Sequence, residues 1–241
     1  MQININSVID SSLEATDGEI GKITSFYFDD DTWTIRYMVV KTGSWLSGRK
    51  VLISTDAISK DSWEGQRVRV DLTKEKVGSS PDIDTDKPVS RQQEQELFDH
   101  YPLQNYWGND MYAGGIWGIT NPSFSLDDST IKQPEEAVKP PEGDTHLRST
   151  DIVGSYNIQA SDGDIGHIKD FIVDDQTWQL CFFVVDTHNW FGGKKVLIPV
   201  SDVKEVQWLN SKVIVNITMD AVKNSKLFHG SEFRHMENNE L

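Results

Sequence analysis

Polar and apolar side chains alternate near the end of residues 1–84, where the run Arg67–Leu72 reads RVRVDL. The same alternation returns in Lys212–Ile217, which reads KVIVNI. Successive side chains of a strand point to opposite faces of its sheet, so this pattern predicts strands with one buried and one exposed face.

The two runs belong to a longer internal duplication. Leu13–Ile83 aligns with Ile158–Phe228 at a constant offset of 145 residues without gaps, and 26 of the 71 positions are identical. Two copies must satisfy the same packing with different residues, so the duplication predicts two small domains of one architecture.

One copy reads as a series of short strands joined by tight turns. The sequence Asp17–Gly21 favours a hairpin turn, a strand is expected over residues 20–28, and the acidic turn Asp29–Thr32 leads to a second strand over 33–41. The apolar run Lys50–Ile53 follows after a glycine-bearing loop. With no long amphipathic helix, this order predicts a mainly β fold: a small antiparallel barrel or strongly bent sheet in each copy, in which closure removes exposed edges.

Tryptophan is duplicated along with the strands. Six of the eight tryptophans form pairs across the two copies: Trp33, Trp45 and Trp63 match Trp178, Trp190 and Trp208. Small domains need bulky core residues, so these rings are interpreted as structural.

The chain divides into residues 1–84 as a first domain, 85–145 as a linker, 146–230 as a second domain and 231–241 as a polar tail. Within the linker, helix formers over 90–101 predict a short helix whose stripe of Leu97, Phe98 and Tyr101 docks on the first barrel. Four prolines lie among acidic and small residues from Ile119 to Thr145, a composition that favours mobility. If all 61 residues of this linker were flexible, they would span about 40 to 47 Å and let the barrels move independently.

Charge narrows the range of partners. The formal net charge is −15 and no segment is basic, so nucleic-acid binding is disfavoured, as is electrostatic docking on an anionic membrane, although peripheral membrane association stays open. One cysteine precludes an intramolecular disulfide. Residues 1–10 contain no basic residue followed by an apolar stretch, and no run in the sequence approaches the roughly 18 to 20 apolar residues of a membrane span, so we expect neither a signal peptide nor a membrane helix. We therefore expect a cytoplasmic protein.

The motifs of both copies resemble the PRC-barrel family. They comprise Asp-Gly-Glu/Asp-Ile-Gly, an aspartate-rich turn before a Thr-Trp pair, Val-Val, a tryptophan-containing loop and Lys-Val-Leu-Ile. The resemblance extends to Asp86–Arg91 and on to Tyr106 and Trp107, and it implies two PRC-type β-barrels. Barrels of this family occur in the cytoplasmic part of the photosynthetic reaction-centre H subunit and in a ribosome-maturation factor. Neither barrel is a catalyst in its own right, so the resemblance implies a protein-binding module.

Acidic clusters are one candidate for chemistry. Asp29, Asp30 and Asp31 in the first copy correspond to a turn with Asp174 and Asp175 in the second. Convergent oxygens hold Ca²⁺, so these turns support an alternative function as a cation or small-ligand sensor, although turn aspartates commonly face solvent and the spacing differs from an EF-hand loop.

Catalytic and metal-binding motifs do not emerge. Cys181 lies within an expected strand and its counterpart is Arg36, while the histidines at 100, 146, 167, 188, 229 and 235 form no metal-binding spacing and do not pair across the copies. We predict no cofactor, no metal and no catalytic residue, and rank a cryptic enzyme last.

The loop 105–118 is the main feature without a counterpart. It combines Tyr106, Trp107, Tyr112 and Trp117 with glycines, and such rings either anchor a partner protein or bury themselves on the first barrel or in an oligomer. The sequence therefore predicts a non-enzymatic protein-interaction or assembly module that acts with a protein partner or as a homodimer.

Overall fold

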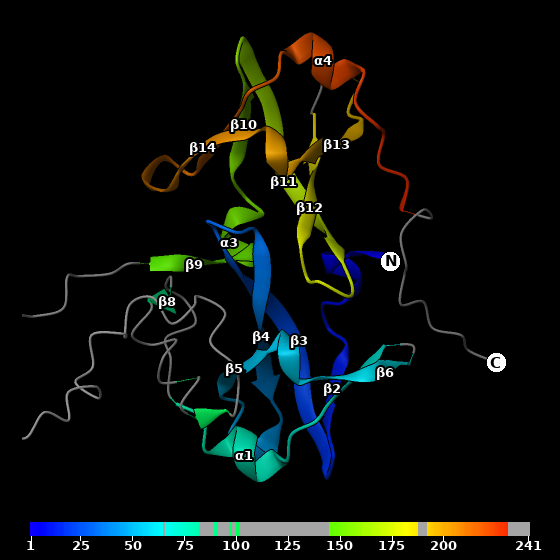
Figure 1. The fold of residues 1–241 in the computed structure, drawn as a ribbon, viewed down its shortest axis with the longest axis vertical. Helices are drawn as coiled ribbons and strands as arrows, with labels where there is room; N and C mark the ends of the chain where they lie inside the picture. The colour runs from blue at the N-terminus through cyan, green and yellow to red at the C-terminus, as the bar shows by residue number, and fades with distance from the viewer. Residues whose placement is uncertain are drawn as a thin grey trace, which may run out of the picture.

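A computed structural model describes residues 1–64, 66–81, 89–90, 97, 100–101, 145–187 and 192–230. The chain is mainly β, and each copy forms a bent sheet with the same strand order (Figure 1). In the first copy the order is β5–β4–β3–β2–β7–β6. The bounds are β2 Ser12–Ala15, β3 Gly18–Asp29, β4 Thr34–Thr42, β5 Lys50–Ser54, β6 Ile58–Glu64 and β7 Arg67–Val70.

The second copy repeats this order as β13–β12–β11–β10–β15–β14. Its strands are β10 Asn157–Ala160, β11 Gly163–Asp174, β12 Leu180–Asp186, β13 Lys195–Pro199, β14 Val203–Gln207 and β15 Lys212–Val215. Each copy ends in a short helix, α1 Lys74–Gly78 or α4 Met219–Lys223, whose first turn is joined to the predicted hairpin turn. Asp17 Oδ1 accepts from Lys74 N–H, and Asp162 Oδ1 from Met219 N–H, both at 2.8 Å.

Two details differ from the predicted antiparallel barrel. The pairs β2–β7 and β10–β15 are parallel, and within the described residues the outermost strands of each path do not pair to close a barrel. In the second copy, chain segments cover the outer edge instead: Leu197 N–H donates to Lys226 O at 2.8 Å, and Phe228 N–H donates to Lys195 O at 2.9 Å. Covering an edge satisfies its backbone groups, so closure is unnecessary there.

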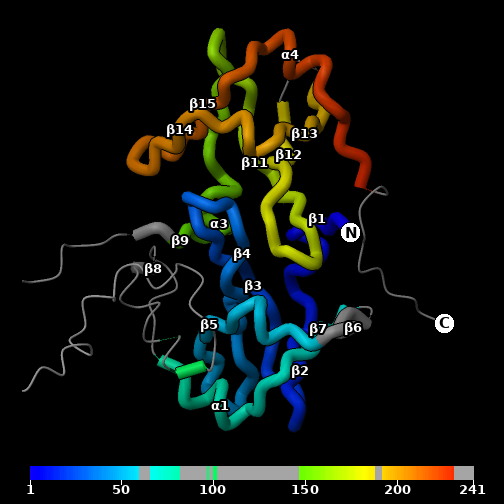
Figure 2. The backbone as a smooth tube through the Cα atoms, in the orientation of Figure 1, coloured from blue at the N-terminus to red at the C-terminus, as the bar shows by residue number. Residues whose placement is uncertain are grey.

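The two copies exchange their first strands. Strand β1 (Gln2–Asn4) precedes the first copy but pairs with β11 of the second, whereas β9 (Thr145–Ser149) precedes the second copy and pairs with β3 of the first. Asn4 lies opposite Ile172, and Ser149 lies opposite Tyr27, so the two exchanges match at the same 145-residue offset. The tube in Figure 2 shows the N-terminal strand lying beside the second copy.

A second junction joins the copies at equivalent residues. Ile35 N–H donates to Trp178 O, and Leu180 N–H donates to Trp33 O, each at 2.8 Å. Between them, Thr34 and Gln179 face each other as a bridge. Thr34 thus faces its own counterpart, and the two hydrogen bonds on either side of it join equivalent residues in opposite directions. The copies are therefore related by a local two-fold axis at this junction, as in a symmetric dimer.

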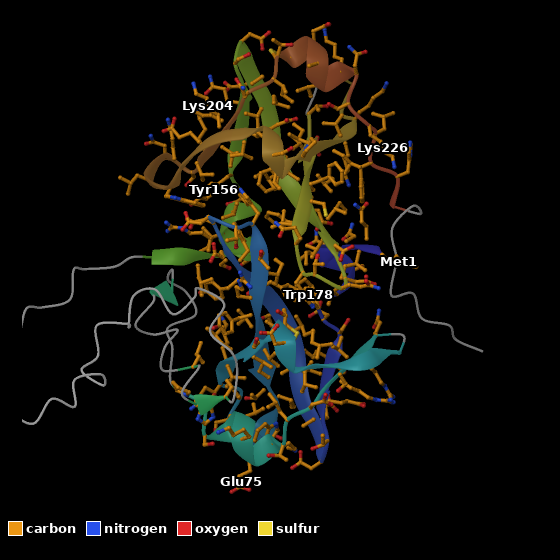
Figure 3. All side chains as sticks on the ribbon, viewed as in Figure 1. Met1, Glu75, Tyr156, Trp178, Lys204 and Lys226 are labelled. Carbon is orange, nitrogen blue, oxygen red and sulfur yellow. The ribbon has the colours of Figure 1, made fainter. Side chains whose placement is uncertain are left out.

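Side chains from both copies form one hydrophobic core. The ring centroids of Trp33 and Phe183 lie 5.5 Å apart, and those of Phe26 and Trp178 lie 6.1 Å apart, so each tryptophan packs against the other copy. Figure 3 shows Trp178 where the two halves meet. Exchanged strands and a common core hold the two copies together, so the independent movement that a fully flexible linker would allow does not occur.

The structural interpretation of the tryptophans holds for Trp33 and Trp178. Trp45 is 36% exposed, with its Nε1–H donating to Ile20 O at 2.8 Å, and Trp208 is half-buried. The Trp63 side chain and Trp190 lie outside the described part.

The predicted docking stripe of the linker is confirmed at two positions. Leu97 and Tyr101 are buried against Tyr27 and Tyr37 on the outer face of the first sheet. Phe98, most of the predicted helix 90–101 and the loop 105–118 lie outside the described residues. Before this stripe, β8 (Val89–Ser90) pairs with β9.

We expect the two halves to stay associated when the chain is cut between residues 102 and 144 at an inserted protease site. The shared core and both strand exchanges survive such a cut. Size-exclusion chromatography before and after cleavage measures this, and separation of the halves at micromolar concentration would contradict the common core.

Candidate interaction surface between the two copies

The acidic turns use their first aspartate to shape the backbone. Asp29 Oδ1 accepts from the N–H groups of Asp31 and Thr32, at 3.0 and 2.9 Å. Asp174 Oδ1 does the same for Gln176 and Thr177, at 3.1 and 2.9 Å. The Thr177 N–H makes the largest contribution to holding the pKa of Asp174 below its ordinary value.

The second aspartate of each turn binds a cation that comes with the exchanged strand. Arg148 of β9 donates from Nε to Asp30 Oδ2 at 2.8 Å, and the amino group of Met1, which precedes β1, donates to Asp175 Oδ1 at 2.6 Å. Burial raises the pKa of Asp30, and Arg148 opposes that rise. The hydrogen bond to Asp175 raises the pKa of the Met1 amino group. Both turns therefore fasten one copy to the other.

Arg148 also contacts the second copy. Its guanidinium lies 4.0 Å from the centre of the Trp208 ring, which packs at a centroid distance of 6.2 Å from Tyr156. Thus one arginine bridges the acidic turn of the first sheet and the β14–β15 hairpin of the second.

The cation-site interpretation of these turns stays a prediction. Asp29 Oδ2 is buried with no hydrogen-bond partner, but the described part of the chain places no group of three His, Cys, Asp or Glu side chains where they could hold a metal ion. The aromatic loop residues Tyr106, Trp107, Tyr112 and Trp117 lie outside the described residues, so their role also stays a prediction.

A groove lies where the two copies meet, which we call the inter-copy groove. Its volume is about 310 Å³, at the low end of the range for ligand pockets. The first copy contributes Ile5, Asn6, Ile9, Thr24 and Ser25, and the second contributes Thr150, Asp151, Gly154, Ser155, Lys169 and Phe171.

Equivalent turns form its two walls. The 3-10 turn η1 (Ile5–Ser7) is capped by Asn4 Oδ1, and the short helix α3 (Thr150–Val153) is capped by Ser149 Oγ, 145 positions later. Because each turn follows an exchanged strand, the strand exchange creates the groove. The walls nevertheless differ: Ile9 corresponds to Gly154, Asn6 to Asp151 and Thr24 to Lys169.

Asp170, beside this groove, is a buried carboxylate that the sequence analysis missed. It is 5% exposed, and its Oδ1 accepts from Asn6 N–H at 3.2 Å and from Phe171 N–H at 2.7 Å. The corresponding residue of the first copy is Ser25. At that place in the first copy, Phe26 N–H donates to Thr150 Oγ1 at 3.1 Å. Burial raises the pKa of Asp170 from 3.8 to about 6, against the lowering effect of the two N–H donors. The sequence feature that could have pointed to Asp170 is an acidic residue where the first copy has a serine.

Cys181 lies in β12 and is half-buried. Its Sγ donates to Gln179 O at 3.4 Å, and burial raises the thiol pKa. A raised pKa disfavours the thiolate, which is the nucleophilic form.

Comparison with family models identifies the family to which the two copies belong. The model of the PRC-barrel domain matches residues 2–77 and 144–222, so the chain belongs to the PRC-barrel family and contains two tandem copies. No curated protein matches the chain. None of the helices in the described ranges is both long enough and apolar enough to cross a membrane.

We predict that Arg148→Met destabilises the protein by about 2 kcal/mol, because it leaves the partly buried Asp30 without its cation. Urea unfolding measures this. Lys223→Met is the matched control: its pair with Asp220 spans 4.0 Å on the surface, and we expect a loss below about 0.5 kcal/mol. Equal losses in the two variants would contradict the fastening role of Arg148.

We predict that Asp170 makes unfolding depend on pH. The unfolded chain releases this proton near 3.8 and the folded chain near 6, so this contribution to stability is present below pH 4 and falls as pH rises to about 6. The full change is worth about 3 kcal/mol.

Asp170→Asn and Asp170→Ser remove this titration. Relative to the unsubstituted chain, both variants should therefore gain about 2 to 3 kcal/mol between pH 4 and pH 7 in urea unfolding. An unchanged difference between variant and parent at the two pH values would contradict the assignment.

Proposed function

We propose that this protein is a non-enzymatic interaction module that binds a segment of a partner protein in the inter-copy groove. The observation that carries the proposal is that the groove is built from equivalent turns of both copies and depends on their exchanged strands. A pair of PRC copies thus presents a surface that one copy does not contain.

The chemistry of the groove suits a polypeptide. Ile9 is half-buried and offers apolar contact, whereas Ile5 and Phe171 are only 2% exposed and belong to the core. Thr24, Ser25 and Ser155 line the same hollow. The hydroxyl groups of Thr24 and Ser155 donate to Val39 O and Ile152 O, so their oxygens can accept from the N–H groups of a polypeptide. A nucleic acid fits less well, since Lys169 is the one cation among the lining residues and the whole chain carries a charge of −15.

Strand exchange also gives the groove rigidity. Its walls are tied by Asn6 Nδ2–H, which donates to Lys169 O at 3.2 Å, and by the Asn6 N–H bond to Asp170. A surface that is already ordered loses less conformational entropy when a partner binds.

The test places a photoreactive amino acid at Ser155 in the full chain, expressed in its own cells. Ser155 is exposed at the groove, and Glu75 on α1 is an exposed control at the far end of the first copy (Figure 3). We expect one discrete protein adduct from position 155 and none from position 75.

Adding Lys169→Glu and Ile9→Ser should lower the yield of that adduct by about tenfold, which corresponds to about 1.4 kcal/mol of binding free energy. An adduct made of two copies of this chain would identify the partner as a second copy. Absence of any adduct at position 155, or equal adducts at both positions, would contradict the proposal.

A further inference from the structure

The outer faces of the two sheets carry apolar side chains at equivalent positions. These are Tyr27, Tyr37, Val39 and Leu52 in the first copy, and Ile172, Phe182, Val184 and Leu197 in the second. They point away from the common core, so each face needs its own cover.

The first face is covered by chain that follows the first copy. Leu97 and Tyr101 pack on it together with Leu147 of β9, and its four side chains are at most 1% exposed. This linker segment therefore seals the outer face of its own sheet.

The cover of the second face differs. Gln2 stands at the position of Leu147, and Phe228, which follows the second copy, packs on the face. Ile172, Val184 and Leu197 are at most 3% exposed, but Phe182 is only half-buried, whereas its counterpart Tyr37 is 1% exposed. Phe228 is also half-buried. We call these two rings the outer aromatic patch.

We propose that the tail, residues 231–241, docks on the outer aromatic patch and completes the cover of the second sheet. The tail follows the second copy and corresponds, at the 145-residue offset, to residues 86–96, which come just before Leu97. It carries apolar Phe233, Met236 and Leu241.

The length and the charge of the tail agree with its docking on this patch. Five residues from Phe228 to Phe233 extend about 17 Å, and neighbouring strands lie only about 4.8 Å apart, so the tail can return over β12. Exposed Lys194, Lys195 and Lys226 lie in the edge segments beside the patch, and the tail contains Glu232, Glu237 and Glu240 against one arginine, Arg234. Figure 3 shows Lys226 at the edge of the second copy. This docking is independent of the inter-copy groove.

The test is a paired substitution in the full chain. Phe233→Ser with Met236→Ser should lower the melting temperature by about 3 to 6 °C and raise the fluorescence of a dye that binds apolar surface. Asn238→Ser with Asn239→Ser is the matched control, and we expect no change in either signal.

Non-additive effects of substitutions in the tail and in the outer aromatic patch identify the docking site. In a Phe182→Ser chain, or a Phe228→Ser chain if the first does not fold, the tail substitutions should lower the melting temperature by less than half as much. Full additivity, or no effect of the tail substitutions, would overturn the proposal. So would sedimentation showing a dimer that Phe182→Ser dissociates, because the occupant would then be a second copy.

Discussion

The structure depends on one constraint: the first strand of each copy hydrogen-bonds to the long central strand of the other. β1 on β11 and β9 on β3 place the turns η1 and α3 side by side, bring Trp33 and Trp178 into a common core and form the groove. Since small single domains bury only about 60% of their unfolded surface, sharing one core between two copies compensates for their size. The long linker therefore connects two parts that are already fastened together.

The contacts of the duplicated aspartates depend on this exchange of strands. Asp29 and Asp174 shape the two turns, and Asp30 and Asp175 bind Arg148 and the Met1 amino group. These cations come from the strand that the other copy supplies. A cation site on Asp29–Asp31 and Asp174–Asp175 stays a prediction. The two fastenings beside the groove are less alike: Asp170 holds one side with a carboxylate that can titrate, whereas Thr150 holds the other with a hydroxyl group.

Sequence reasoning recovered features whose cause is local. The Asp17–Gly18 hairpin turn, the alternation in β7 and β15, and the docking of Leu97 and Tyr101 follow from spacing and residue type. Parallel pairing of β2 with β7 was missed, because alternation is the same in parallel and antiparallel strands of a half-buried sheet. Asp170 was missed because it is buried where the two copies meet, and its partner Asn6 lies 164 positions away in the sequence.

The duplication and its motifs are enough to establish two copies of one β fold from the PRC-barrel family, with paired tryptophans and acidic turns. Packing in three dimensions adds the exchange of strands, the cations that the acidic turns receive from the opposite copy, and the groove between equivalent turns. These features join residues that lie far apart along the chain. A duplication specifies what each copy can form internally. The backbone N–H and C=O groups of an edge strand, however, can pair with a strand of either copy, and the packing of side chains selects which one.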